Sequence, residues 1–179
     1  MLKIDNRTKL LRIFFDDPLP KGIGFQLREL SRISKIAPPS VKKYLSDFEK
    51  EKLVNVSKHR IHGYPVYAAN RDNDSFKFLK KVETLKMIKE SGLLDFLDDH
   101  CFPEVIILFG SAARGEDLKE SDLDIFLICK VKKLELSAYE EEVGRKINIL
   151  MNNSFVGLSK ELKNNILNGI IMKGYLKVY

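Results

Sequence analysis

Apolar residues recur at helical spacing in the first part of the chain. The pattern predicts two helices, over residues 5–15 and 25–34, separated by a turn at Asp16-Asp17-Pro18 and Pro20-Lys21-Gly22. The residues expected to point inward from these helices are Leu10, Leu11, Phe14, Phe15, Leu27, Leu30 and Ile33.

A third helix and a hairpin are predicted next. Pro38-Pro39-Ser40 is expected to open the helix, because proline is tolerated in a first turn. Its apolar face is formed by Val41, Tyr44 or Leu45, and Phe48. Alternation in residues 53–56 and 64–68 predicts two strands, joined by a loop over residues 59–63.

Residues 72–103 are predicted to be a helical connector, with a break at Gly92. The apolar residues Leu93, Leu94, Phe96 and Leu97 are expected to pack on the module that follows. Since no Ser- or Gly-rich linker is present, the modules can be held rigidly, or the connector can form a contact in a homodimer. Both alternatives remain open.

Short apolar runs predict the strands in the rest of the chain. Residues 104–109 and 125–129 predict buried strands, residues 134–145 a helix and residues 144–150 another strand. A closing helix and strand are expected around Leu158, Leu162, Ile166 and Leu167, followed by Gly169-Ile170-Ile171.

Composition excludes several classes of protein. The chain has 179 residues, two cysteines and a formal charge of +6, and no apolar run long enough to span a membrane. Cys101 and Cys129 are too few for a disulfide scaffold, so we expect buried free thiols in a reducing compartment, the cytoplasm. Residues 1–72 hold 15 basic and 8 acidic residues, a net of +7, whereas residues 73–179 hold 16 and 17, a net of −1. The basic excess therefore lies in the first module, which suggests a polyanionic partner.

The stretch LRELSRISKIAPPSVKKYLSDFEKEKLV resembles the winged helix-turn-helix family of DNA-binding regulators. The resemblance implies a winged-helix domain over residues 1–71, with duplex DNA as a partner and the third helix in the major groove. Residues expected to contact DNA are Ser40, Lys42, Lys43 and Ser46 on that helix, with Lys58 and Arg60 on the wing beside His59 and His62. The alternative is a winged helix used for protein contact, with its charges solvated.

The turn after the first buried strand carries the candidate chemistry. A strand followed by Gly110-Ser111 and a helix start leaves backbone N–H groups free to bind a phosphate, and Ser111 adds a hydroxyl donor. Asp122 and Asp124 lie two residues apart, so on a strand they share a face and can hold a hard divalent cation such as Mg²⁺. Leu123 and Ile125 are expected to point into the core.

The segment LFGSAARGEDLKESDLDIFLI resembles the signature of the DNA polymerase β superfamily of nucleotidyltransferases, and in particular its minimal members. The resemblance implies that residues 104–179 form a small α/β nucleotidyltransferase domain with a mixed sheet, so that the chain as a whole is α+β. In that family the Gly-Ser segment holds the triphosphate, with ATP the expected nucleotide, and the Asp pair binds magnesium. Arg114 either reaches a phosphate or pairs with Glu116; both alternatives remain open.

A third carboxylate usually lies on the next strand of this family, and here its position falls at Asn148. Asparagine cannot accept a proton as a carboxylate does. Glu140, Glu141 and Glu142 lie nearby in sequence but are expected to form a solvated helix face. Whether the chain is an enzyme is therefore left open by the sequence.

Two hypotheses follow. The first is an enzyme that transfers a nucleoside monophosphate from a Mg²⁺-bound triphosphate to a hydroxyl of a small molecule or a protein. The resemblance to antitoxin-type minimal nucleotidyltransferases suggests a toxin-like partner as such an acceptor. The second is a DNA-binding transcriptional regulator whose nucleotidyltransferase domain binds nucleotide without catalysis because of Asn148. A structural role for both folds is disfavoured by the intact Gly-Ser and Asp-x-Asp.

Overall fold

The computed structural model describes residues 5–178, so the expected domain ends at residues 1–4 and 179 lie outside the described part. The chain divides into two compact units, Met1–Lys80 and Lys81–Tyr179. The division falls inside helix α4 (Asp74–Glu90). The boundaries expected from the sequence, after residues 71 and 103, remain predictions.

The first unit begins with three helices, α1 (Asn6–Asp16), α2 (Leu27–Ser34) and α3 (Pro38–Lys50), with a 3₁₀ turn, η1 (Pro20–Gly22), between the first two. Asp5 caps α1 by accepting the Thr8 N–H at 2.7 Å, and this bond holds the pKa of the Asp5 carboxyl below its usual value. Gln26 and Glu29 form a capping box at the start of α2. The predicted proline start of α3 is confirmed.

A hairpin follows the helices. Its strands, β1 (Val54–Lys58) and β2 (Pro65–Ala69), pair antiparallel with Val54 opposite Ala69. Phe25 adds a third short segment, because its N–H and C=O bond the backbone of Tyr67 at 2.7 and 2.9 Å. The order of helix, helix, helix and hairpin is the one predicted.

The core of the first unit collects the apolar faces of these elements. Leu10, Phe14, Leu30, Val41, Leu45 and Phe48 are at most 1% exposed. The prediction for Ile33 is wrong, since its side chain is 52% exposed and Ser34 is buried instead. The buried face of α2 runs through Leu30 and Ser34, four residues apart, with Leu27 partly buried beside them, and Ile33 lies off that face.

The second unit is built on a mixed four-stranded sheet in the order β5-β4-β3-β6. Its strands are β3 (Val105–Phe109), β4 (Leu123–Ile128), β5 (Ile147–Asn152) and β6 (Ile170–Gly174). β3 runs antiparallel to β4 and β6, and β4 runs parallel to β5. The helices are α5 (Leu93–Cys101), α6 (Gly110–Arg114), α7 (Ser137–Val143) and α8 (Lys160–Leu167), together with the end of α4.

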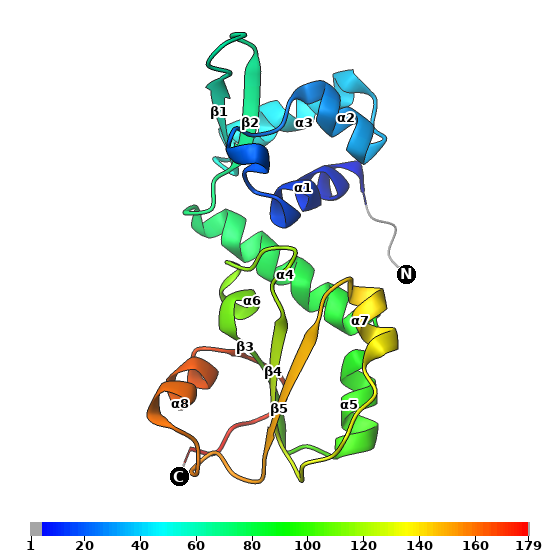
Figure 1. Ribbon diagram of the computed structural model, residues 1–179, viewed down its shortest axis with the longest axis vertical. Helices are drawn as coiled ribbons and strands as arrows, with labels where there is room; N and C mark the ends of the chain where they lie inside the picture. Colours follow the sequence, from blue (N-terminus) through cyan, green and yellow to red (C-terminus); the bar gives the residue numbers. More distant parts are fainter. Residues whose placement is uncertain (1–4, 179) are drawn as a thin grey trace. The chain divides into compact units, whose positions relative to one another are not determined.

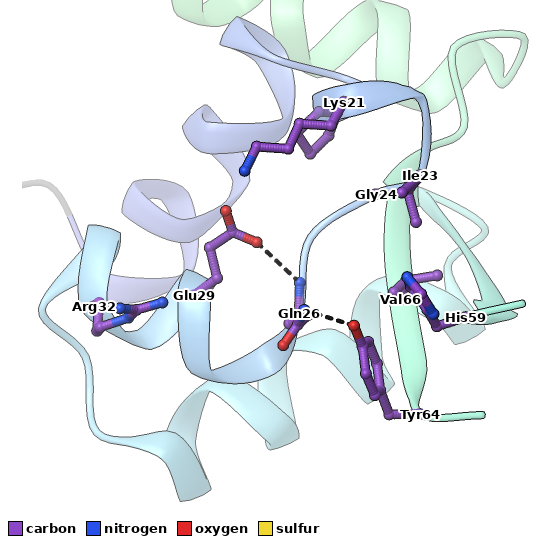
Figure 2. Close-up of a pocket in the computed structure, with 10 residues that line it drawn as sticks. Lys21, Ile23, Gly24, Gln26, Glu29, Arg32, His59, Tyr64 and Val66 are labelled. Carbon is purple, nitrogen blue, oxygen red and sulfur yellow. Dashed lines mark hydrogen bonds between the residues drawn. The ribbon is translucent and has the colours of Figure 1, made fainter. Parts of the chain in front are cut away.

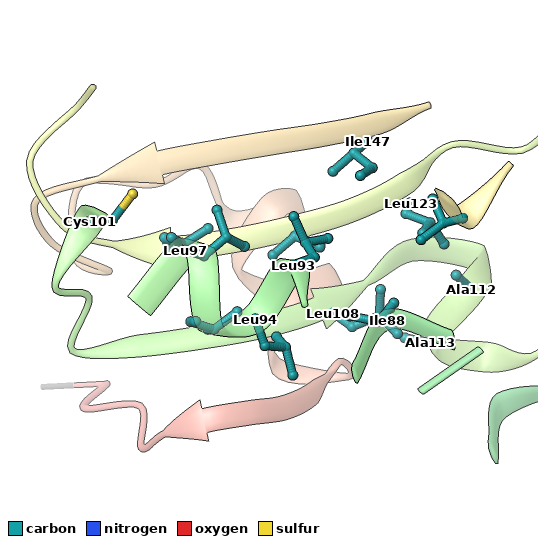
Figure 3. Close-up of a cluster of buried hydrophobic side chains, with 14 of the residues drawn as sticks. Ile88, Leu93, Leu94, Leu97, Cys101, Leu108, Ala112, Ala113, Leu123 and Ile147 are labelled. Carbon is teal, nitrogen blue, oxygen red and sulfur yellow. The ribbon is translucent and has the colours of Figure 1, made fainter. Parts of the chain in front are cut away.

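Both faces of this sheet are covered. Leu123, Ile125 and Leu127 of β4 point into a cluster with Ile88, Leu93 and Leu97 of α4 and α5 (Figure 3). Phe126 and Ile128 point the other way and pack with Phe155 and Ile166. Helix α8 accordingly lies on the opposite side of the sheet from α5 and α7 (Figure 1). The α+β class, the break at Gly92 and the inward direction of Leu123 and Ile125 are confirmed.

Three expectations for the second unit need correction. The helix predicted over 134–145 spans only Ser137–Val143, and the strand predicted over 144–150 is Ile147–Asn152, because Gly144 ends the helix in a left-handed turn. Leu167 is 52% exposed, whereas Ile166 beside it is buried. Glu140 does not belong to a solvated face: its carboxylate accepts the Ile147 N–H at 3.0 Å and the Lys146 ammonium at 2.9 Å.

Cys101 and Cys129 are both buried free thiols, as predicted. Burial, followed by the neighbouring Cys101 thiol, raises the pKa of Cys129 to about 11. No helix in residues 5–178 combines the length and the apolar character that crossing a bilayer requires.

Leu30 and Ile33 on α2 are a matched pair for testing the core. Leu30→Ala is expected to lower the free energy of unfolding by about 2–5 kcal/mol, because it leaves a cavity at a fully buried site. Ile33→Ala is expected to change it by about 0.5 kcal/mol or less, because the side chain is 52% exposed. Urea denaturation followed by circular dichroism measures both. Equal losses would contradict the assignment of Ile33 to the surface, and Leu30→Val provides a milder variant.

Glu140 makes the stability of the second unit depend on pH. The Ile147 N–H, and then Lys146, lowers the pKa of the Glu140 carboxyl below its usual value. The carboxylate therefore stabilises the fold fully at pH values above the ordinary, unfolded pKa of Glu140. This contribution is lost as the pH falls through the lower pKa of the folded state. Glu140→Gln is expected to flatten this part of the pH profile. Urea midpoints between about pH 6 and about pH 3 measure the effect, with the exposed Glu142→Gln as control. A profile that keeps its slope in Glu140→Gln would rule out this role.

Candidate active site

The turn between β3 and α6 brings backbone against a carboxylate. Gly110 has a φ of +74°, a left-handed conformation that favours glycine. A Cβ at this position would lie 2.5 Å from the Oδ2 atom of Asp124. The absence of a side chain at Gly110 is therefore what lets the Asp124 carboxylate lie directly against the turn.

Strand register gathers the polar side chains at one end of the sheet. Asp124 pairs with Phe109 of β3 on one side and with Asn148 of β5 on the other. The Asn148 amide donates from Nδ2 to Oδ1 of Asp124 at 2.9 Å. One oxygen of Asp124 therefore contacts Asn148, while the other lies over Gly110. The structure thus brings together Gly110, Asp124 and Asn148, residues that the sequence singled out separately.

Asp122 lies one residue before the start of β4, and it is exposed. The expectation that both aspartates stand on the strand is thus met by Asp124 alone. Backbone bonds hold the approach to the strand: the Leu123 N–H donates to the Lys146 C=O at 2.9 Å, and the Leu118 N–H donates to Ser121 Oγ at 2.9 Å. Asp122 is therefore carried on a bonded segment beside the site.

The helix after the turn is a single short one. Ser111 is half-buried in its first turn, and its C=O accepts the Glu116 N–H at 3.0 Å. Arg114 donates from Nε to the Glu116 carboxylate at 2.8 Å. Of the two alternatives for Arg114, the structure therefore contains the pairing with Glu116. Both side chains are partly exposed, so the pair adds about 1 kcal/mol or less to stability.

The donor atoms here suit one hard cation held together with a phosphate ligand. No group of three or more His, Cys, Asp or Glu side chains in residues 5–178 is arranged to hold a metal ion. Mg²⁺, however, is commonly bound through one or two carboxylates, with waters and substrate phosphates completing its shell. Asp122 and Asp124 fit that requirement, and the amide oxygen of Asn148 is a further neutral oxygen ligand.

Two contacts near the site were not anticipated. Asp117, expected in a polar loop, is buried and forms an ion pair with Arg145, whose side chain is 8% exposed. Glu140 bonds the N–H of Ile147, directly before Asn148. Neither contact has a local sequence signal. The partners of the first are 28 residues apart, and those of the second meet only where α7 turns into β5.

The basic residues expected to meet DNA are placed on the surface of the first unit. Lys42, Lys43 and Ser46 are exposed on α3, and Ser40 is half-buried at its start. Lys58 ends β1 and Arg60 lies in the loop of the hairpin, both exposed. All six therefore remain available to solvent, as a binding surface requires.

Rings and hydrogen bonds order the base of that hairpin loop. The rings of His59, His62 and Tyr64 stack, with centroids 4.7 to 5.8 Å apart. Nδ1 of His59 accepts the N–H groups of Ile61 and His62, each at 3.3 Å, so this histidine shapes the loop. Gln26 donates to the Tyr64 hydroxyl at 2.9 Å across a pocket of about 220 Å³ (Figure 2). The hairpin is thereby tied to the start of α2.

Comparison with known proteins assigns the second unit. Residues 92–176 match the family model described as Polymerase beta, Nucleotidyltransferase. A search of curated proteins finds no match to the chain. The family match covers α5, the whole sheet and the site formed by Gly110, Asp122, Asp124 and Asn148. Residues 92–176 are therefore a nucleotidyltransferase-family domain.

Proposed function

We propose that the nucleotidyltransferase-family domain binds a magnesium–nucleoside triphosphate, with ATP the expected nucleotide, and transfers its nucleoside monophosphate to a hydroxyl acceptor. The observation that carries the proposal is the position of the Asp124 carboxylate, directly over the Gly110 turn and hydrogen-bonded to Asn148. A phosphate bound at the turn would lie next to that carboxylate and to Asp122.

Each residue has a defined part in this proposal. The backbone N–H groups at the start of α6 and the Ser111 hydroxyl bind phosphate oxygens. Asp122 and Asp124 would hold Mg²⁺, which when bound neutralises charge on the triphosphate. Asn148 fixes the orientation of Asp124 by donating to Oδ1. We expect the magnesium–triphosphate to bind at the end of the sheet where β3 ends and β4 begins.

The transfer itself forms one bond and breaks one. The acceptor oxygen bonds to the α-phosphorus, the bond from that phosphorus to the pyrophosphate oxygen breaks, and pyrophosphate leaves with the bonding electrons. The hydroxyl proton must pass to a base, and the neutral amide of Asn148 is not one. We assign that role to a carboxylate of the Asp pair or to solvent. The acceptor is a hydroxyl of a small molecule or of a partner protein.

Asn148 also supports a variant of this proposal, in which the domain binds nucleotide without turnover. An amide at this position provides no negative charge for a second cation and accepts no proton. Nucleotide occupancy would then serve as a signal to the rest of the chain. The two forms of the proposal differ only in whether nucleoside monophosphate is transferred.

A second candidate function, DNA binding as a transcriptional regulator, concerns the first unit. We propose that it is a winged helix that binds duplex DNA through α3 and the loop of the hairpin. Support comes from its net charge of +7 over residues 1–72 and from the exposed Lys42, Lys43 and Ser46 on one helix. The resemblance to winged-helix regulators adds the expectation that α3 enters the major groove.

Substitutions at Asp124 and Asn148 test the nucleotide site. Asp124→Asn is expected to weaken Mg²⁺-dependent ATP binding by on the order of tenfold or more, measured by calorimetry with a non-hydrolysable ATP analogue. Asn148→Asp adds a carboxylate next to Asp124 and is expected to raise nucleoside monophosphate transfer by on the order of 100-fold. Label transfer from radioactive ATP to the protein or to a hydroxyl acceptor measures that rate.

Asn152→Asp is the matched control, because it makes the same chemical change on the same strand at the end away from Asp124. It is expected to leave both measurements unchanged. If wild type binds no Mg²⁺-nucleotide, or if Asp124→Asn binds it as tightly as wild type does, the proposed nucleotide site is wrong. If nucleotide binds but neither wild type nor Asn148→Asp transfers label, the form without turnover is favoured.

Salt dependence tests the DNA proposal. Affinity for duplex DNA, measured by fluorescence anisotropy, should fall steeply with salt through counterion release. Lys42→Ala with Lys43→Ala is expected to reduce the slope of log K against log salt by about 2, because two phosphate contacts are lost. Lys9→Ala, an exposed lysine of α1, serves as control. Failure to enrich any sequence from a random duplex pool would refute a role as a sequence-specific regulator.

A further inference from the structure

A buried ion pair joins two segments that adjoin the candidate site in sequence. Asp117 follows α6, and its side chain is fully buried; Arg145 lies just before β5, and its side chain is 8% exposed. The Arg145 guanidinium donates to Oδ2 of Asp117. Two charges removed from water in this way require a reason, because their desolvation can exceed their mutual attraction.

The two residues belong to the segments that carry the site. Asp117 comes directly after Glu116, whose N–H bonds the Ser111 C=O at 3.0 Å, and it lies five residues before Asp122. Arg145 lies three residues before Asn148, and the adjacent Lys146 C=O accepts the Leu123 N–H at 2.9 Å. The ion pair therefore joins the segment between the Gly-Ser turn and Asp122 to the segment that leads into Asn148.

The alternative is that the pair simply stabilises the fold. Replacing a buried ion pair by apolar side chains of similar volume is often neutral or stabilising, so stability alone does not account for such a pair. The directional geometry of the pair gives a better reason for its presence. A guanidinium and a carboxylate pair in one direction and at one distance, whereas apolar side chains can pack in several ways. The pair is suited to hold two loops in one relative position.

We propose that Asp117 and Arg145 are positioning residues of the nucleotide site, which hold the segment of Asp122 and the segment of Asn148 in register with the Gly110–Ser111 turn. The inference rests on the proposed nucleotide binding. The two residues contact one another rather than the nucleotide, and they act through the backbone of the segments that they join.

The second unit also contains a matched control. Lys173 of β6 and Asp98 of α5 form another ion pair, with side chains 52% and 32% exposed. Lys173 pairs in the sheet with Ile106, toward the end of β3 that is remote from Gly110. This pair joins distant parts of the chain, as the first does, but it joins no segment that carries a site residue.

The experiment compares three variants of the full chain with wild type: Asp117→Leu/Arg145→Met, Arg145→Lys, and the control Asp98→Leu/Lys173→Met. Three quantities are measured: the urea midpoint, the Kd for a Mg²⁺-bound non-hydrolysable ATP analogue, and amide hydrogen exchange. The two variants at the buried pair, the double variant and Arg145→Lys, should keep the urea midpoint near that of wild type. Each should raise the Kd by on the order of tenfold or more and speed amide exchange in residues 115–124 and 145–148. The control should change neither the Kd nor that exchange.

The outcomes separate this inference from the nucleotide proposal. If wild type binds the analogue and both variants at the buried pair bind it equally well, the positioning role is wrong and nucleotide binding stands. If wild type binds no nucleotide, the nucleotide proposal fails, and hydrogen exchange then decides whether the pair orders these segments. Loss of affinity only in proportion to a lowered urea midpoint, with Arg145→Lys equal to wild type, would mean that the pair is merely structural.

Discussion

The alignment of three strands at one end of the sheet is the constraint on which the candidate site depends. β4 pairs antiparallel with β3 and parallel with β5, and the register sets Phe109, Asp124 and Asn148 in one row. Side chains alternate across a sheet, so a shift of one residue would turn Asp124 into the apolar cluster under α5. The buried leucines and isoleucines of β4 oppose such a shift. The hydrophobic core therefore determines where the carboxylate lies.

The same row explains why the site is polar at one end of an otherwise apolar face. Asp124 and Asn148 share their face of the sheet with Phe126 and Leu150, which pack toward α8. The hydrogen bond between them satisfies the carboxylate, and Gly110 leaves the second carboxylate oxygen next to open backbone. A charged group can be tolerated beside a core in this way, because it keeps polar partners at the end of the strands.

Much of the fold was predictable, because periodicity directly reports which side of an element is buried. The alternation of β4 predicted the inward direction of Leu123 and Ile125, and Gly92 predicted the break between α4 and α5. Helix boundaries were less predictable. Phe25 pairs with Tyr67 as a strand segment, so α2 begins two residues later than expected. A residue that is recruited into a sheet by a partner 42 positions away leaves no trace in local periodicity.

Residue type, spacing and the family resemblance were enough to predict the α+β class, the Gly-Ser turn, the two aspartates and the neutral residue at position 148. These are local properties of one strand or one turn. The folded chain decided which of two alternatives Arg114 takes, the pairing with its near neighbour Glu116. Packing between separate segments determined that Glu140 bonds the start of β5 and that Asp117 and Arg145 meet in the interior. Whether a charged side chain is solvated or paired depends on what the fold brings beside it. Desolvation and ion pairing arise between segments, so they become readable only when those segments are placed in space.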